Sequence, residues 1–200
     1  GLAMTQELLG GPEDDADQGA ADVGALGIGP NDCAICISAS GTTRYTVAAL
    51  RTAKTAGAGT VGIAGNSGAP LLADADVAIL LASGAEVISG STRMAAGTAQ
   101  KAALNMLSTL IGVRMGHVHD NFMVNVTADN DKLVLRATGI VARIAGVGPD
   151  VAAKAMQTAH NEVKPAILLA AGAKDLSEAQ QLLAQSGGVV RKALAVLGRP

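Results

Sequence analysis

Three short apolar runs alternate with segments of helical spacing in the first half of the sequence, and this alternation constrains the fold more than any other feature. The runs cover residues 33–37, 60–64 and 77–82, and each is short enough to be a strand of a parallel sheet. Residues 44–56 have the spacing of a helix, which Gly57 would end. Strands separated by helices pair in parallel, so the sequence predicts an α/β fold with a parallel sheet flanked by helices.

A sheet of three parallel strands is a poor domain by itself. Parallel sheets have both faces covered and usually contain more strands. We therefore expect residues 1–126 to be the C-terminal portion of a larger α/β domain, and the chain to begin inside that domain.

The second half of the sequence has helical patterns almost to its end. Pro149 suits the first turn of a helix because it lacks the amide that would be unpaired there, and Asp175 with Glu178 is typical of a helix start. Residues 127–200 are therefore predicted to form a small, all-helical C-terminal bundle. The helices expected in this half cover residues 91–114, 127–145 and 189–197, with others beginning near Pro149 and Asp175.

Composition excludes several classes of protein. The chain has 200 residues, of which 49% are hydrophobic and 16% charged, so a disordered chain is excluded. A net charge of −2 and an aromatic content of 1% do not fit nucleic-acid binding. We see no uncharged apolar run long enough for a membrane span and no signal peptide in residues 1–10, and we expect a cytoplasmic protein.

Cys33 and Cys36 form a C-x-x-C string inside the first apolar run. In a strand, residues three apart point to opposite faces, whereas redox pairs of this spacing lie at a helix start. We therefore interpret both cysteines as small residues of a buried strand.

The segment Ser38-Ala-Ser-Gly-Thr-Thr43 joins the first predicted strand to the following helix. Such a loop places hydroxyls and free backbone N–H groups at a helix N-terminus, which suits a phosphate. It also lies at the carboxyl edge of the sheet, where open α/β folds bind ligands. An ordinary strand-to-helix turn without a ligand is the alternative.

Two further segments carry polar groups that could act on a ligand. After the third run, Ser89, Ser91 and Thr92 could donate hydrogen bonds and Glu86 could accept them from sugar hydroxyls, although helix capping explains the same residues. Glu13 belongs to an acidic cluster that is either a solvated helix start or a source of a proton-transferring carboxylate.

A metal site is not expected. His117, His119 and Asp120 lie close together in the sequence, but no third well-spaced ligand accompanies the two histidines.

These segments resemble the N-acetylmuramic acid 6-phosphate etherases and their relatives, the glucokinase regulatory proteins, both built on the sugar isomerase (SIS) fold. The resemblance covers nearly the whole chain, including the helical tail, which is similar to a small ubiquitin-associated bundle. The segments that carry it are residues 84–101, 104–109, 121–126 and 130–133, together with 11–15 and 37–41.

The resemblance implies a carbon–oxygen lyase that needs no cofactor or metal. The lactyl ether of N-acetylmuramic acid 6-phosphate is eliminated and water adds back, giving N-acetylglucosamine 6-phosphate and lactate in cell-wall amino-sugar recycling. One of the family's two catalytic glutamates corresponds to Glu13. Asp14 beside it is a second candidate that could assist Glu13, and it ranks below Glu13. Ser38, Ser40, Gly41, Thr42, Glu86 and Ser91 correspond to positions that hold the sugar phosphate. Family members are homodimers with sites near the subunit interface; the small-residue helix over residues 94–110 could face such a partner or be ordinary core.

The sequence also departs from the family. The first family glutamate and the first ligand loop lie upstream of the position matching Gly1, so we expect the 200 residues alone to be inactive. Ala95 stands where the family usually has Lys, Asn125 where it has Asp, and His119 near a usual Tyr. A non-catalytic sugar-phosphate-binding regulator and a sugar-phosphate isomerase are the alternatives; a regulator would need no proton-transferring carboxylate such as Glu13.

Overall fold

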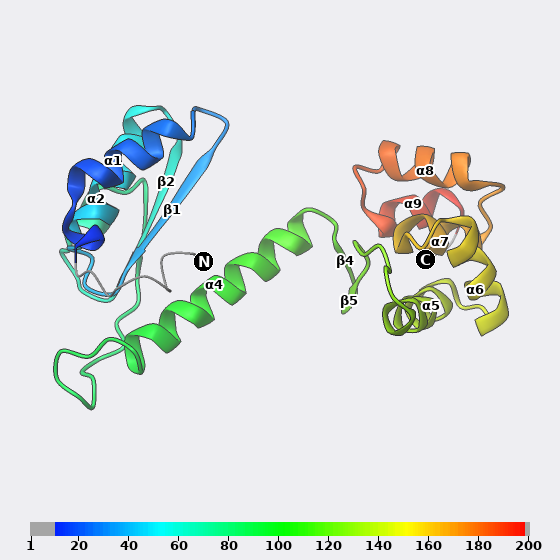
Figure 1. The fold of residues 1–200 in the computed structure, drawn as a ribbon. Coiled ribbons are helices and arrows are strands. Elements are labelled where there is room, and N and C mark those ends of the chain that lie inside the picture. Colours follow the sequence, from blue (N-terminus) through cyan, green and yellow to red (C-terminus); the bar gives the residue numbers. More distant parts are fainter. Residues whose placement is uncertain (1–10, 199–200) are drawn as a thin grey trace. The chain divides into compact units, whose positions relative to one another are not determined.

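A computed structural model describes residues 11–198 (Figure 1). The expectation about a signal peptide in residues 1–10 lies outside these residues. The chain forms two compact units, Gly1–Asn105 and Met106–Pro200, and the long helix α4 (Ala95–Arg114) contains the boundary between them. The sequence analysis instead divides the chain after residue 126, into the α/β portion and the helical bundle, and this division stays a prediction.

The first unit contains the predicted parallel sheet. The strands β1 (Cys33–Ser38), β2 (Gly59–Ala64) and β3 (Val77–Leu80) lie in that order, and both neighbouring pairs are parallel. The fold class predicted from the alternating runs is therefore confirmed. Besides the first part of α4, the described helices of this unit are the short 3-10 helix η2 (Pro12–Asp14), α1 (Ala16–Ala25), α2 (Arg44–Thr55) and α3 (Pro70–Asp74).

The helices α2 and α3 pack on the sheet, and α1 packs on α2. The small core between them consists of Val47, Leu50, Ala64 and Leu71. Gly62 of β2 allows this packing, because a Cβ atom there would lie 2.4 Å from the carbonyl oxygen of Leu71 in α3.

The interpretation of both cysteines as residues of a buried strand is wrong for Cys33. That side chain is exposed, whereas Cys36 is partly buried against the core, where burial raises the pKa of its thiol. The two residues do lie on opposite faces of β1, and α2 and α3 cover only the face of Cys36. In addition, β1 has one neighbouring strand in the described sheet, so its first residue stays open to solvent.

Thr60 and Asp76 connect the start of β2 to the residue before β3. The buried Thr60 donates to Asp76 Oδ2 from its backbone N (3.0 Å) and its hydroxyl (2.7 Å), and Lys54 Nζ lies 2.8 Å from Asp76 Oδ1. The hydrogen bond from Lys54 and those from Thr60 lower the pKa of Asp76 to about 2.

We therefore expect acid to weaken this unit through Asp76. A carboxyl group whose pKa is lower in the folded state stabilises that state above its unfolded pKa of about 3.9, and the stabilisation is lost as the pH falls toward the folded value. The free energy of unfolding of the natural chain should therefore fall between about pH 5 and about pH 2 by more than that of Asp76→Asn. Urea unfolding at several pH values checks this, and parallel curves for the two proteins would contradict it.

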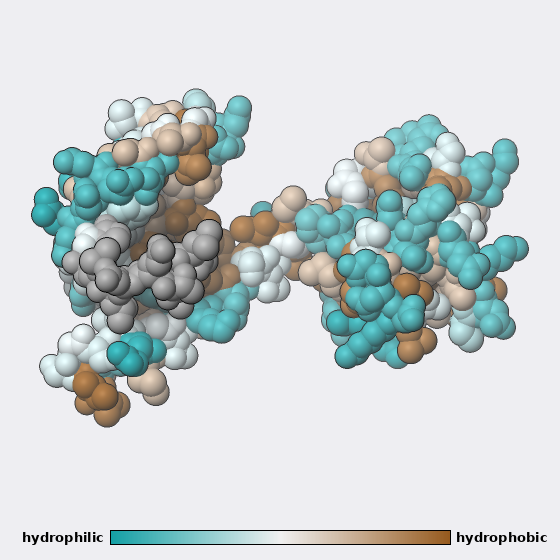
Figure 2. All heavy atoms as spheres, viewed as in Figure 1, coloured by the Kyte–Doolittle hydropathy of each residue, from teal (hydrophilic) through white to brown (hydrophobic). Residues whose placement is uncertain are grey.

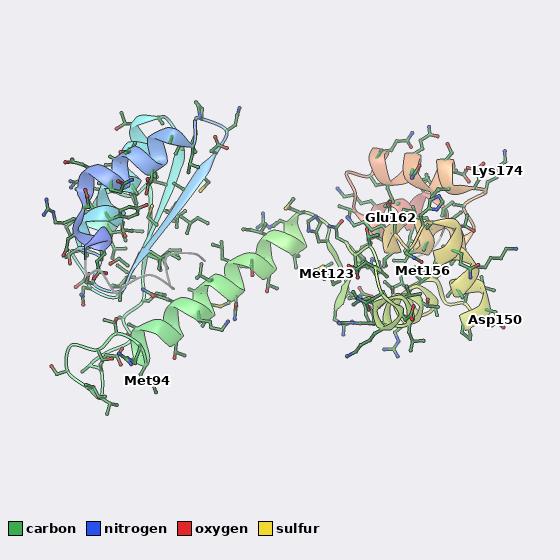
Figure 3. The ribbon with its side chains drawn as sticks, viewed as in Figure 1. Met94, Met123, Asp150, Met156, Glu162 and Lys174 are labelled. Carbon is green, nitrogen blue, oxygen red and sulfur yellow. The ribbon has the colours of Figure 1, made fainter. Side chains whose placement is uncertain are left out.

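The second unit is the predicted helical bundle with a short hairpin before it. The hairpin pairs β4 (Val118–His119) with β5 (Phe122–Met123) in antiparallel fashion. Figure 3 labels Met156, which is buried among the helices, and the exposed residues Asp150 and Lys174. The helices are α5 (Asp131–Ala145), α6 (Pro149–Thr158), α7 (Val163–Ala171), α8 (Leu176–Gln185) and α9 (Val190–Val196).

The predicted starts of these helices are confirmed in part. Pro149 occupies the first turn of α6, and Asp175 accepts a hydrogen bond from Glu178 N at the start of α8. The prediction that a helix begins at residue 127 is wrong, because α5 begins at Asp131. Thr127 instead forms an isolated β-bridge with Glu162, and the Asn130 side chain caps α5.

The helix α4 differs from the rest of the chain, because none of its residues is buried. The helix is nevertheless apolar, and the brown spheres along it in Figure 2 contrast with the mainly hydrophilic surface of the helical bundle. Its exposed large apolar side chains are Leu104, Met106, Leu110, Ile111 and Val113. No helix within residues 11–198 has both the length and the apolar character needed to cross a membrane.

Candidate functional site

The loop between β1 and α2 is held in one shape by its own hydroxyls. The buried Ser38 Oγ accepts a hydrogen bond from Gly41 N at 3.0 Å and lies 2.8 Å from Thr43 Oγ1. Ser40 Oγ accepts from Thr42 N and from the Thr42 hydroxyl, at 3.2 and 3.0 Å. These contacts fix the loop without any ligand.

Gly41 is required at the turn of this loop. Its φ angle is +73°, a left-handed conformation that side chains rarely adopt. A Cβ atom there would also lie 2.5 Å from Ala69 Cβ and 2.8 Å from Ala64 Cβ. The turn therefore brings the loop against β2 and the start of α3, and Asn66 Nδ2 donates to Ser40 O from the neighbouring turn.

The N-terminus of α2 is open toward the same loop. Thr43 is the N-cap residue, but its side chain does not cap the helix, since its hydroxyl bonds to Ser38 instead. Within residues 11–198, no acceptor takes up the N–H groups of Arg44, Tyr45 and Thr46. Free N–H groups at a helix N-terminus, together with the helix dipole, attract an anion such as a phosphate.

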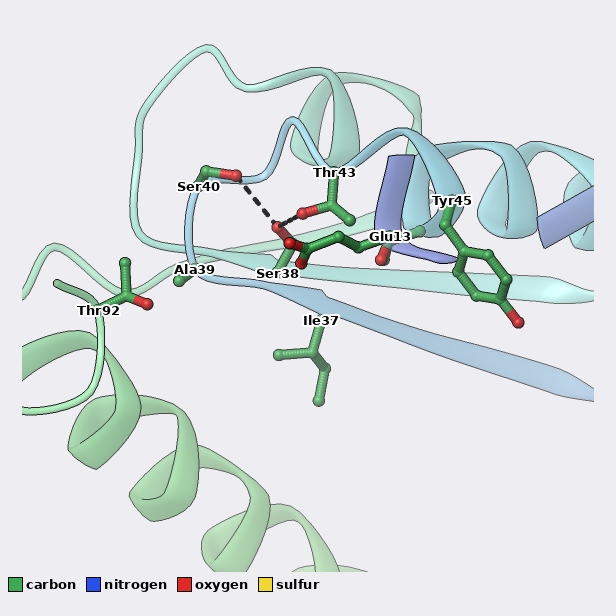
Figure 4. Close-up of a pocket in the computed structure, with 9 residues that line it drawn as sticks. Glu13, Ile37, Ser38, Ala39, Ser40, Thr43, Tyr45 and Thr92 are labelled. Carbon is green, nitrogen blue, oxygen red and sulfur yellow. Dashed lines mark hydrogen bonds between the residues drawn. The ribbon is translucent and has the colours of Figure 1, made fainter. Parts of the chain in front are cut away.

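A cavity of about 530 Å³ lies beside this loop (Figure 4). Ser38 and Ser40 line it, as does Glu13 from η2, although Ser38 lies 25 positions after Glu13 in the sequence. In the figure the Glu13 carboxylate points toward Ser38 and Thr43. The remaining lining residues are Ile37, Ala39, Thr43, Tyr45, Thr46 and Thr92.

Sequence reasoning identified part of this lining. Glu13, Ser38 and Ser40 lie in one cavity, and Thr92 of the later loop joins them. Gly41 shapes the loop without lining the cavity, whereas Thr42 lines a second cavity of about 370 Å³ with Arg44 and Arg51. The roles of all these residues toward a ligand stay predictions.

Glu86 and Ser91 do not line the larger cavity. Glu86 accepts hydrogen bonds from Ala95 N and Ala96 N, both at 3.0 Å, and these bonds lower the pKa of its carboxyl group. Glu86 therefore caps the start of α4, which is the alternative stated for this segment. Ser91 N closes a turn onto Ile88 O at 3.0 Å. Binding of a sugar by either residue stays a prediction.

Sequence reasoning missed two lining residues, Tyr45 and Thr46, of which Tyr45 is the larger. It is the only tyrosine of the chain and stands in the first turn of α2. The available signal was its position, two residues after the hydroxyl-rich loop.

The histidines lie elsewhere in the chain. His119 is buried in the second unit, its pKa is lowered by burial, and Asp120 beside it pairs with Arg191. Residues 11–198 contain no group of three or more His, Cys, Asp or Glu side chains placed to hold a metal ion.

The hydroxyl network of the loop leads to a prediction about stability. Ser38→Ala should lower the free energy of unfolding by about 1–3 kcal/mol, because the buried Gly41 N–H loses its acceptor. Tyr45, the only tyrosine, lies in the same cavity, so its fluorescence during urea unfolding reports on this unit. Ser67→Ala, at an exposed turn, is the control and should change stability by less than about 0.5 kcal/mol. Equal effects of the two substitutions would contradict a stabilising role of Ser38.

The fold and this loop define the class of protein. Residues 7–110 match the sequence profile of the SIS domain, which is more than half of the chain, and the protein therefore belongs to the SIS domain family. Three similar proteins are each named N-acetylmuramic acid 6-phosphate etherase. The chain is 46% identical to the one from Deinococcus radiodurans over 97% of its own length, 45% identical to that from Geobacillus thermodenitrificans over 97%, and 42% identical to that from Streptomyces avermitilis over 94%.

These relatives are longer than the chain. The alignments span 64%, 66% and 61% of the three relatives, in the same order. The similarity includes the helical bundle as well as the SIS domain, since it covers 194, 194 and 189 residues, well beyond residue 110.

Proposed function

We propose that the protein is a carbon–oxygen lyase that cleaves the lactyl ether of N-acetylmuramic acid 6-phosphate to give N-acetylglucosamine 6-phosphate and lactate. Similarity to the named etherases supports the substrate and the reaction. The observation that carries the proposal is that Glu13 shares a cavity with the hydroxyl-rich loop and the open N-terminus of α2. The helix end can bind the phosphate of a sugar phosphate, and the carboxylate next to it can exchange a proton with the sugar.

The proposed reaction begins with the loss of a proton from C2 of the opened sugar, which the C1 aldehyde acidifies. The bond between C3 and the ether oxygen then breaks, the departing lactate oxygen gains a proton, and water adds to the resulting double bond at C3. Each step moves a proton, so two acid–base groups are needed. Glu13 is proposed as one of them, and the family's other glutamate lies upstream of the residue matching Gly1.

The other site residues are proposed to hold the substrate. The N–H groups at the start of α2 and the hydroxyls of Ser40 and Thr42 would bind the phosphate. Gly41 would keep those hydroxyls in place, and Ser38 would support them from within the loop. Glu86 and Ser91 are proposed to approach the sugar from the segment before α4, where Glu86 also caps that helix.

Lactate release is the test of this function. The full-length protein should release lactate from N-acetylmuramic acid 6-phosphate, and the activity should survive treatment with a metal chelator. The 200-residue chain should bind N-acetylglucosamine 6-phosphate in calorimetry, but it should release no lactate from N-acetylmuramic acid 6-phosphate. Binding without lactate release by the full-length protein would favour the sugar-phosphate-binding regulator, and isomerisation of a sugar phosphate would favour the sugar-phosphate isomerase.

We also propose a cytoplasmic homodimer that serves amino-sugar recycling. The exposed apolar side chains of α4 support a partner surface there, since such a stretch is unusual for an isolated helix in water. Sedimentation of the full-length protein distinguishes a dimer from a monomer.

A further inference from the structure

The helix α1 is joined to α2 by a close backbone approach and one hydrogen bond between residues distant in sequence. A Cβ atom on Gly19 would lie 2.4 Å from the carbonyl oxygen of Tyr45, so the two backbones nearly touch there. Less than one turn further along α1, Asp22 Oδ2 accepts a hydrogen bond of 2.7 Å from the Tyr45 hydroxyl. These two contacts on one residue of α2 are part of the packing that places α1 on α2.

The place of Glu13 depends on α1. Glu13 belongs to η2, and only Asp14 separates it from Asp15, the N-cap residue of α1, which accepts from Gln18 N at 2.9 Å. Within residues 11–198, no side chain or backbone group forms a hydrogen bond with the Glu13 carboxylate. Among the described residues the carboxylate has no hydrogen-bond partner, so its place in the cavity follows from the backbone of η2, which leads into α1 and itself contacts α2.

Tyr45 both lines the cavity and contacts α1. Its ring lines the cavity, while its hydroxyl points away from Ser38 and Ser40 (Figure 4). That hydroxyl is occupied by Asp22, whose other oxygen accepts from Gln18 Nε2 at 2.5 Å. The bond from Tyr45, followed by that from Gln18, lowers the pKa of Asp22, and the same bond to Asp22 raises the pKa of Tyr45. At neutral pH this solvent-exposed bond therefore joins a protonated phenol to a carboxylate, so it is charge-assisted.

We propose that the Asp22–Tyr45 hydrogen bond is a clamp that positions Glu13 for proton transfer. This rests on the proposed function, and it makes Asp22 a positioning residue that never touches the substrate. A displacement of the carboxylate by about 1 Å can greatly slow proton transfer, because the carboxylate must lie within hydrogen-bond distance of the proton that it removes.

Kinetics of the full-length protein test the clamp. Asp22→Ala should lower kcat by roughly tenfold to a hundredfold, with KM changed by less than about threefold. Asp22→Asn keeps an oxygen that can accept from Tyr45 and should restore most of kcat. Tyr45→Phe should lower kcat as Asp22→Ala does, and the double variant should be no slower than the slower single variant, because both remove the same bond. Additive losses would overturn the clamp and assign Tyr45 a direct role in the cavity.

Asp74→Ala is the matched control. Asp74 Oδ2 also accepts a 2.7 Å bond from an α2 side chain 23 residues away, that of Arg51, but it joins α3 and not α1 to α2. This variant should keep kcat unchanged. A loss of kcat equal to that of Asp22→Ala would mean that general loosening of α2, and not the place of Glu13, explains the effect.

A second measurement needs no activity. In NMR spectra of the 200-residue chain, ionisation of Glu13 should shift the amide signals of Ser40 and Thr43. Glu13→Gln lacks this group, so the pH-dependent shift that the variant loses is the one caused by Glu13. Asp22→Ala should abolish it and Asp22→Asn should keep it. Persistence of the shift in a folded Asp22→Ala chain would overturn the clamp. If lactate release fails but these shifts behave as expected, the proposed function is wrong and the positioning of Glu13 by Asp22 stands.

Discussion

Glu13→Gln is expected to lower lactate release by the full-length protein by roughly 10²- to 10⁴-fold, the usual contribution of one acid–base group. The substitution keeps the size of the side chain and removes only its ability to exchange a proton. Since no described residue bonds to the Glu13 carboxylate, the cavity and the loop should keep their shape. Binding of N-acetylglucosamine 6-phosphate should therefore change by less than about threefold.

Two outcomes of this experiment have different meanings. Asp17→Asn, an exposed acidic residue in the first turn of α1, is the matched control and should keep full activity. Turnover of Glu13→Gln close to that of the natural protein would remove Glu13 from the mechanism. Loss of binding together with turnover would instead assign Glu13 to holding the substrate.

The strands were predictable because their signals are local. Each apolar run ended within about two residues of the observed strand, and alternation with helices was sufficient to predict parallel pairing. The exposure of Cys33 was not predictable in the same way, because it depends on which face of the sheet the helices cover. Likewise, helical spacing over residues 127–145 did not reveal that Thr127 pairs with Glu162, 35 residues further along the chain.

In the candidate site, too, the features set by contiguous residues were predictable and those set by the packing of distant segments were not. The Ser38–Thr43 loop follows directly from a strand, a polar turn and a helix that are contiguous in sequence. The approach of Glu13 to this loop depends on the packing of α1 on α2, which no periodicity encodes; it was expected only through resemblance to a family. Glu86 was assigned to a sugar, yet its carboxylate bonds to the first amides of α4, which a sequence pattern cannot distinguish from ligand binding.

Gly19→Ala should have the second large effect, because it acts on the packing that brings Glu13 to the loop. The added methyl group would meet the backbone of Tyr45 at 2.4 Å, and a backbone atom cannot rotate away as a side chain can. Either α1 shifts or α2 is distorted, and overpacking of this kind costs typically about 1–3 kcal/mol. In the full-length protein kcat should also fall by about tenfold or more, because η2 moves with α1.

Gly24→Ala in the same helix separates this steric effect from the general effect of replacing a helical glycine. A Cβ atom at Gly24 meets nothing within 4 Å, so the substitution should be neutral or stabilise the chain by up to about 1 kcal/mol. Urea unfolding followed by Tyr45 fluorescence, together with lactate release, gives both quantities for both variants. If Gly19→Ala proved as stable and as active as Gly24→Ala, the contact between α1 and α2 would not control the place of Glu13, and the catalytic role proposed for that residue would need another support.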